Sequence, residues 1–184
     1  MNVVVVDAGL PVGTRSAGER AVVDQLDALV ALDHRVTVVA LGHDPGCDPG
    51  TDGTVDDLTG RGVTVHPTVG PDALRAVLRT TGADVVVVHR PGPALAVGPV
   101  LAEHPTLPVV YAGHDLHADR IGDETALLGG DPRRARLAAV AERAAWARAD
   151  VVTYPTETEA AAVRERTGRD HAVAVPYYRL TAPD

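Results

Sequence analysis

Short runs of β-branched and other apolar residues alternate along the chain with longer segments whose apolar positions recur every three or four residues. The short runs are typical of strands that are buried on both faces, and the longer segments of amphipathic helices. We expect strands at 3–6, 35–41, 62–66, 84–89, 108–112, 150–154 and 172–175. Their alternation with helices predicts one α/β domain over residues 1–184, with a Rossmann-like, doubly wound, mostly parallel sheet of about six or seven strands and helices on both faces.

The helix signals vary in strength along the chain. Ser16 and Thr156 each stand three residues before a glutamate, which is the pattern of a capping box at a helix start. A third helix begins near Pro132 and runs to about Arg148, and its spacing predicts that Leu137, Val140, Ala141 and Ala144 face inward. The segment 42–60 predicts a long surface loop with a weak helical turn near 55–58. The segment 121–130 predicts a polar connection.

Polar and ionisable residues follow three of the expected strands. They are His89 and Arg90 after the fourth, His114, Asp115, His117 and Arg120 after the fifth, and Thr156 and Glu157 after the sixth. Ligands of open parallel sheets bind beyond the carboxyl ends of the strands, so these residues are candidates for a common site. The alternative is that they only end the strands and cap the helices that follow.

The loop after the first strand carries Gly9, Gly13 and Gly18, which is not the Gly-x-Gly-x-x-Gly fingerprint of dinucleotide binding. Asp44 is the only candidate for a ribose-binding acid, so the sequence argues against classical NAD binding. The helix that Ser16 begins can still offer backbone N–H groups and its dipole to an anion. A plain strand-to-helix turn is the alternative.

Composition excludes several chemistries. The formal charge of −8 and the 3% content of aromatic residues argue against nucleic-acid binding. The chain has no lysine, and Ser16 is its only serine, so P-loop, Schiff-base and serine-triad mechanisms are excluded. The single cysteine, Cys47, excludes an intrachain disulfide and favours a cytoplasmic setting. The start of the chain, 1–7, predicts a buried strand and carries no targeting or transmembrane signal.

Imidazole is a good ligand for zinc, so His89, His114 and His117 form a conceivable metal site and, with Asp115, a metal-dependent hydrolase. His114 and His117 converge only if the segment that joins them is helical. We expect no metal.

The order of the motifs resembles the N-terminal domain of group 1, or family 4, GT-B glycosyltransferases. The motifs are Ser-Ala-Gly-x-Arg at 16–20, Leu-Asp-His-Arg-Val-Thr-Val-Val at 32–39, Asp-Val-Val-Val-Val-His-Arg-Pro at 84–91, Val-Val-Tyr-x-x-x-Asp-Leu-His at 109–117, and Arg-Ala-Asp-Val-Val-Thr at 148–153 with Thr-Glu-x-Glu after it. The resemblance covers essentially the whole chain.

In that family the N-terminal domain binds the acceptor, a second Rossmann-like domain binds the nucleotide-sugar donor, and the sugar is transferred in the cleft between them with retention. The resemblance implies that His114 and Asp115 are catalytic residues beside the transferred sugar. It implies that Gly13, Ser16 and Gly18 face the donor diphosphate. It also implies that His89, Arg90, His117, Arg120, Thr156 and Glu157 line the cleft or contact the acceptor.

The donor-binding domain of the family has no counterpart in these residues, because 173–176 resembles the point where the family crosses to it. We therefore expect an acceptor-binding half that is inactive alone. It would bind no cofactor tightly and would use a nucleotide-diphosphate sugar as the donor substrate. Its partners would be a small-molecule or glycan acceptor and the donor-binding domain, without nucleic acid or a transmembrane segment, and peripheral membrane contact is compatible with it. The alternative is a non-catalytic α/β module that holds a small molecule or a partner chain.

Overall fold

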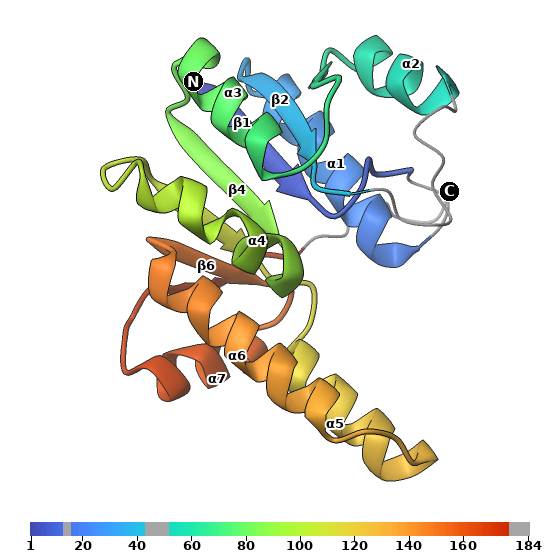
Figure 1. Cartoon of the computed structure of the whole chain (residues 1–184), viewed down its shortest axis with the longest axis vertical. Helices are drawn as coiled ribbons and strands as arrows, with labels where there is room; N and C mark the ends of the chain where they lie inside the picture. The colour runs from blue at the N-terminus through green and yellow to red at the C-terminus, as the bar shows by residue number, and fades with distance from the viewer. Residues whose placement is uncertain (13–15, 43–51, 177–184) are drawn as a thin grey trace, which may run out of the picture.

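The apolar runs pair into one parallel sheet in the computed structural model, which describes residues 1–12, 16–42 and 52–176. Within this part of the chain the strand order is β3-β2-β1-β4-β5-β6-β7, and every pair is parallel. The strands are β1 (Asn2–Asp7), β2 (Arg35–Ala40), β3 (Thr64–Val65), β4 (Val85–His89), β5 (Val109–Ala112), β6 (Val151–Tyr154) and β7 (Ala172–Ala174). The predicted fold class, a doubly wound Rossmann-like sheet, is therefore confirmed (Figure 1).

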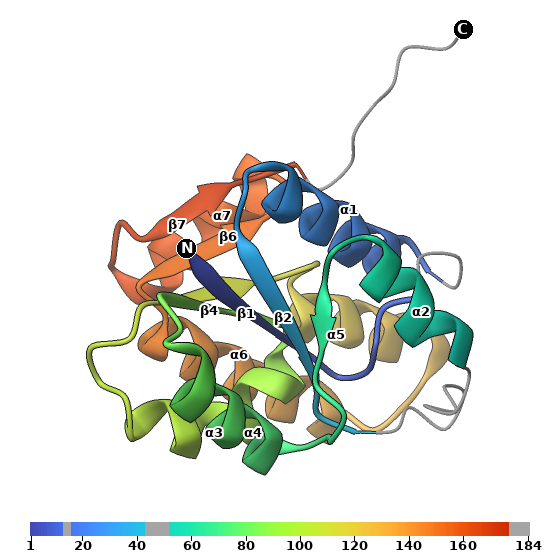
Figure 2. The ribbon, with the colours of Figure 1, turned by 90° about the horizontal axis from the view of Figure 1, so that it is seen from above.

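Helices connect the strands and cover both faces of the sheet. They are α1 (Ala17–Ala31), α2 (Asp52–Gly60), α3 (Pro71–Thr81), α4 (Pro91–Ala102), α5 (His117–Leu128), α6 (Arg133–Arg148) and α7 (Glu157–Thr167). Figure 2 shows α3, α4 and α6 on one side of the sheet and α1 and α7 on the other. None of the helices in the described ranges is long and apolar enough to cross a membrane.

Alternate residues of the central strands feed two cores. Val4, Val6, Val86 and Val88 pack against α3 and α4, and Val3, Val5 and Val87 pack against α1 and α2. A third cluster joins the aromatic side chains of β5, β6 and α6, which are Tyr111, Tyr154 and Trp146. Burial on both faces explains why these strands read as continuous apolar runs rather than as alternating patterns.

The sheet reverses its winding between β1 and β4. From β1 the chain proceeds outward through β2 and β3, and from β4 it proceeds outward the other way through β5, β6 and β7. The last residues of the two central strands are Asp7 and His89, and β5 ends beside β4 with His89 in register with Ala112. In an open α/β sheet such a reversal creates a crevice at the carboxyl ends of the strands.

Two expectations about 121–144 are wrong. The expected polar connection is mostly the helix α5, whose first backbone N–H groups are bound by the Glu142 carboxylate of α6 rather than by a local cap. Leu137, Val140 and Ala144 of α6 are exposed, because the inward face of this helix is formed by Ala141, Glu142, Ala145 and Trp146. The prediction missed this face because it contains the buried Glu142, and a glutamate in the sequence indicates an exposed position.

The expected loop 42–60 also contains more structure than predicted. Helix α2 occupies its second half and buries Leu58 in the core beside α1. Residues 43–51, which include Asp44 and Cys47, lie outside the described residues, and so does Gly13.

Candidate functional site

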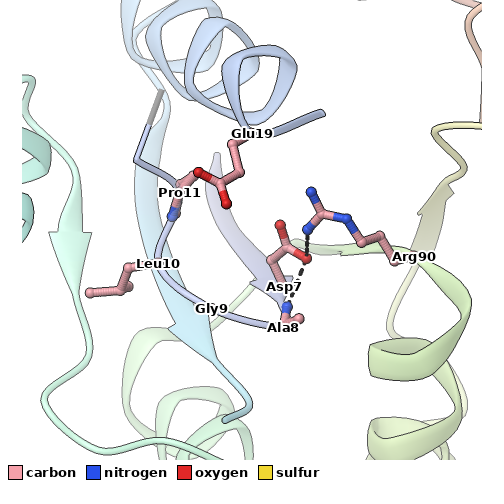
Figure 3. A pocket seen from close by; sticks show the side chains of 7 residues that line it. All are labelled: Asp7, Ala8, Gly9, Leu10, Pro11, Glu19 and Arg90. Atoms are coloured by element: carbon pink, nitrogen blue, oxygen red, sulfur yellow. Dashed lines mark hydrogen bonds and ion pairs between the residues drawn. The ribbon is translucent and has the colours of Figure 1, made fainter. Parts of the chain in front are cut away.

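A buried ion pair joins the two central strands at the switch point of the sheet. Asp7, the last residue of β1, accepts a hydrogen bond from the Arg90 guanidinium, which follows β4. The side chain of Asp7 is 2% exposed and that of Arg90 is 24% exposed, and Figure 3 shows the two pointing toward each other. Asp7 also accepts a hydrogen bond from the backbone N–H of Ala8, at 2.7 Å. Burial raises the pKa of Asp7, and Arg90 opposes that shift.

The backbone of Arg90 is strained. Its φ of 66° and ψ of 152° lie in a region that is essentially reserved for glycine, and the next residue, Pro91, begins α4. Such a conformation costs about 1–3 kcal/mol and persists only where surrounding contacts enforce it. Here the ion pair with Asp7 is the contact that holds the guanidinium over the end of β1.

His89 and His114 form a second connection across the same edge. Nδ1 of His89 lies 3.0 Å from Nε2 of His114, and Nε2 of His89 lies 2.8 Å from the side-chain oxygen of Gln25 on α1. Because the Gln25 oxygen only accepts, Nε2 of His89 carries the proton and its Nδ1 accepts from His114. This tautomer leaves Nδ1 of His114 unprotonated.

Both imidazoles are held in the neutral form. Burial lowers the pKa of His89 to about 3, and the nearby Arg90 charge acts in the same direction. The pKa of His114 also falls to about 3 because of burial, with His89 and Arg90 adding to the effect. His114 is therefore a hydrogen-bonding group without charge at physiological pH, in contrast to an exposed histidine, whose pKa is about 6.5.

The start of α1 packs directly onto this network. The Ser16 hydroxyl accepts a hydrogen bond from the backbone N–H of Glu19, as the capping pattern predicts. A Cβ on Gly18 would lie 3.2 Å from Nδ1 of His114 and 3.4 Å from the guanidinium of Arg90. A methyl group at this position would crowd both side chains, so glycine allows the helix to approach them closely.

A pocket of about 290 Å³ opens beside the ion pair. The loop after β1, from Ala8 to Pro11, forms one wall, and Glu19 and Arg90 face it from α1 and from the end of β4 (Figure 3). The Glu19 carboxylate is held in place by the backbone N–H of Val12, at 3.2 Å. The carboxylate of Glu19 and the guanidinium of Arg90 therefore both line the pocket, next to the buried Asp7.

Asp115 and His117 form a separate cluster at the start of α5. Nδ1 of His117 lies 2.6 Å from the Asp115 carboxylate, which also accepts from Nε of Arg120 at 2.8 Å. Burial opposes the shift, but the hydrogen bonds from His117 and Arg120 hold the pKa of Asp115 below its ordinary value. Burial would lower the pKa of His117, yet its hydrogen bonds to Asp115 and the charge of Glu142 raise it.

Glu142 supports this cluster from α6. Its side chain is fully buried, and its two oxygens accept from the backbone N–H groups of His117, at 2.7 Å, and Ala118, at 3.1 Å. Burial raises the pKa of Glu142, while the two N–H groups oppose the rise. The carboxylate thus caps a helix that begins 25 residues earlier in the chain.

Thr156 and Glu157 lie past β6 on the same edge but serve the local helix. Thr156 and Glu159 form the predicted capping box of α7, and Glu157 pairs with Arg164 two helical turns further on. Neighbouring Tyr154 packs so tightly against Gly113 that a Cβ there would overlap its ring.

The structure therefore divides the candidate residues into three groups. His89, Arg90, His114 and Gly18 meet at the switch point, Asp115, His117 and Arg120 meet at the start of α5, and Thr156 and Glu157 stay with α7. His89 is 2% exposed, so it positions His114 rather than contacting a ligand. In the described ranges no group of three His, Cys, Asp or Glu side chains is arranged to hold a metal.

Four residues at these sites were missed as site residues in the sequence, namely Asp7, Glu19, Gln25 and Glu142. Asp7 carried a usable signal, because it is an acid at the end of a fully apolar strand that leads into a glycine loop. Glu19 was recognised only as a capping residue. Nothing in the local pattern around Gln25 or Glu142 indicates their partners, which come from other elements.

Comparison with known proteins bears directly on this fold and edge. The chain matches the Glycosyl transferase 4-like domain over residues 16–178. The chain belongs to this family. The match confirms the resemblance to family 4 glycosyltransferases, and it includes the strand ends that carry His89, Arg90 and His114.

Two solved structures of glycosyltransferases resemble this glycosyl transferase 4-like domain. A sucrose-phosphate synthase from Thermosynechococcus elongatus matches 96% of the chain with a TM-score of 0.64 and 15% identity, and 48% of its own length is covered. The glycotransferase of kitacinnamycin matches 84% of the chain with a TM-score of 0.44 and 18% identity, and 45% of its length is covered. The domain thus spans about half the length of these structures. Comparison with curated protein sequences gives no match.

Proposed function

We propose that this chain is the acceptor-binding half of a retaining glycosyltransferase that uses a nucleotide-diphosphate sugar. The family membership and the neutral, tightly held His114 at the switch point are the observations that support the proposal. A second, donor-binding half would form the opposite wall of the cleft. The isolated chain would then transfer little or no sugar.

His114 is the residue that we assign to the transferred sugar. A neutral imidazole can hydrogen-bond a sugar hydroxyl and adds no positive charge beside the positive charge that develops at the anomeric carbon. His89 and Gln25 fix the orientation of that ring, so its position does not have to be reorganised during the reaction. Asp115 would contribute through His117, whose ring it holds.

The start of α1 is the part of the chain that we assign to the donor diphosphate. Backbone N–H groups and the helix dipole at Ser16 and Gly18 suit an anion there, and Gly18 keeps the approach open. The predicted role of Gly13 in the same loop stays a prediction. The diphosphate would also contact the donor-binding half.

The pocket between the β1–α1 loop and Arg90 is the site that we assign to the acceptor. Glu19 and Arg90 offer an acceptor and a donor of hydrogen bonds, which fits a polyhydroxylated small molecule or glycan. The single cysteine of the chain still leads us to expect a cytoplasmic enzyme.

The proposal is tested by sugar transfer in the polypeptide that includes whatever follows Asp184 in the gene. With a donor and an acceptor identified by screening, His114→Gln should lower kcat by about 100-fold, in the range of a lost electrostatic contact in the transition state. Gly18→Ala should lower kcat/KM by roughly 10-fold or more because the new methyl group displaces His114 and Arg90.

His34→Gln is the matched control, because it changes a partly buried histidine in the turn before β2, at the opposite edge of the sheet. It should leave transfer unchanged. Wild-type rates for His114→Gln would reject the site assignment. Efficient transfer by residues 1–184 alone would reject the proposed division into two halves, and tight acceptor binding without any transfer in the longer polypeptide would favour a non-catalytic binding module.

A further inference from the structure

The helical hairpin of α5 and α6 carries an exposed apolar surface at its far end. Leu127 and Leu128 end α5 with exposed fractions of 83% and 79%, and Leu137 on α6 is 69% exposed. Val140 continues the surface one turn along α6, and it is exposed as well. Figure 1 shows the two helices side by side, projecting away from the sheet.

Three arginines stand between these leucines in the sequence, after Leu128 and before Leu137. Arg133, Arg134 and Arg136 lie in the first turn of α6 and are exposed, and none of them forms an ion pair with a described residue. Asp131 is the one acid between Leu128 and Leu137, and its carboxylate accepts from the backbone N–H of Arg133 at 2.9 Å. The far end of the hairpin is therefore basic in a chain whose formal charge is −8.

We propose that this hairpin tip, formed by Leu127, Leu128, Arg133, Arg134, Arg136 and Leu137, docks onto an anionic lipid bilayer. Leucines that enter the acyl boundary and arginines that bind lipid phosphates are the two halves of an interfacial anchor. Asp123 and Glu124 lie one turn before Leu127 and Leu128, and Glu124 pairs with Arg120 of the same helix. Asp119 lies in the first turn of α5 and pairs with Arg166. At the tip itself three arginines outnumber the single acid, Asp131, so its charge favours an anionic surface.

A second copy of the chain fits the surface less well. A two-fold contact through the tip would place the three arginines against their own equivalents, and like charges across an interface are repulsive. An anionic bilayer satisfies both the arginines and the leucines. The inference does not rest on the proposed transferase function, because it uses no residue of the candidate site.

Vesicle sedimentation tests the inference with the 184-residue chain. Vesicles of phosphatidylcholine with about 30% phosphatidylglycerol should bind it, vesicles of phosphatidylcholine alone should not, and salt should weaken the binding. Arg134→Glu with Arg136→Glu should weaken binding about 25-fold or more, as expected for two surface charges. Leu127→Ser with Leu128→Ser should weaken it about 10-fold or more.

Matched controls exist on other surfaces of the chain. Arg35→Glu with Arg79→Glu makes the same change in net charge, and Leu32→Ser removes a leucine that is 67% exposed. Neither should alter binding. The inference is overturned if the anionic vesicles do not bind the chain, if the control variants lose as much binding as the tip variants, or if sedimentation velocity shows a dimer that the leucine substitutions dissociate.

Discussion

His114 and His117 stand three residues apart, yet their surroundings shift their pKa values in opposite directions. His114 is buried beside His89 and the Arg90 guanidinium, so its pKa falls to about 3. His117 lies between the carboxylates of Asp115 and Glu142, so its pKa rises despite burial. Two histidines that follow β5 therefore differ in their chemistry. His114 at the switch point is neutral, whereas His117 at the start of α5 is protonated more readily than an ordinary histidine.

The largest expected effect comes from removing the Arg90 guanidinium beside His114 at the switch point. Arg90→Ala leaves Asp7 buried without its partner, so we expect a loss of about 3–5 kcal/mol in the free energy of unfolding, measured in urea. Arg90→Gly should lose about 1 kcal/mol less, because glycine adopts the φ of 66° without strain. Arg61→Ala, which breaks exposed pairs with Asp27 and Asp57, should cost under about 1 kcal/mol and serves as the control. Equal losses at both arginines would contradict the buried pair.

The second test removes Glu142, which supports His117 at the start of α5. Glu142→Ala leaves the backbone N–H groups of His117 and Ala118 without their acceptor, which should cost about 2–3 kcal/mol. Glu142→Gln keeps one acceptor oxygen and should cost about 1 kcal/mol. In both variants the pKa of His117, followed by NMR, should fall while His114 stays neutral. A Glu142→Ala protein as stable as the wild type would refute the interhelical cap, and exposed Glu124→Ala is the control.

The third test uses pH. Because the folded-state pKa values of His89 and His114 lie at about 3, the unfolded chain takes up their protons first as the pH falls below about 6.5. Stability should therefore drop by about 1 kcal/mol per histidine between pH 6.5 and 5.5. His117 acts with the opposite sign: its contribution is complete below its unfolded pKa and is lost as the pH rises through the raised folded value.

Urea unfolding across pH 5–8 measures both effects, and NMR titration assigns them. His114→Asn should flatten the loss on the acid side, whereas His117→Asn should flatten the loss on the alkaline side. A His114 ring that titrates near pH 6.5 in the folded protein would disprove its desolvation.

The smallest expected effect comes from Arg120, the exposed partner of Asp115 at the start of α5. Arg120→Ala removes one hydrogen bond to Asp115 but leaves His117 in place, so stability should change by less than about 0.5 kcal/mol. The pKa of Asp115 should rise, as followed by NMR of its carboxyl carbon. Arg136→Ala at the hairpin tip is the control and should leave the pKa of Asp115 unchanged. If Arg136→Ala shifted this pKa as much as Arg120→Ala does, the effect could not be assigned to the hydrogen bond from Arg120.

The sequence predicted the sheet because its strands are apolar on both faces, and it predicted the caps at Ser16 and Thr156 because their partners lie three residues away. It missed the extent of α5 and the direction of α6 because both depend on Glu142, whose partners are 24 and 25 residues distant. Local patterns carry no record of such contacts.

The candidate site was likewise predictable where neighbouring strand ends identify its residues, and not where contacts between distant elements decide. Strand ends identified His89, Arg90 and His114 because parallel strands finish at one edge. They did not indicate that Asp115 pairs with His117 rather than with His114, because that contact depends on how the chain turns into α5. They also did not separate the buried His89 from the partly exposed His114, since that difference depends on Gln25 and Gly18 of α1.

The junction of β1 and β4 also has a kinetic consequence. It is the ladder through which the two halves of the sheet meet, and it pairs segments as distant as Asn2 and Asp84, which are 82 residues apart. Closing so long a loop is slow, so we expect this ladder to form late in folding, after β1–β2 and β4–β5. Arg90 would then leave the folding rate nearly unchanged, and its substitution would act by accelerating unfolding. The residue that holds the crevice together would thereby also determine how long the native sheet survives.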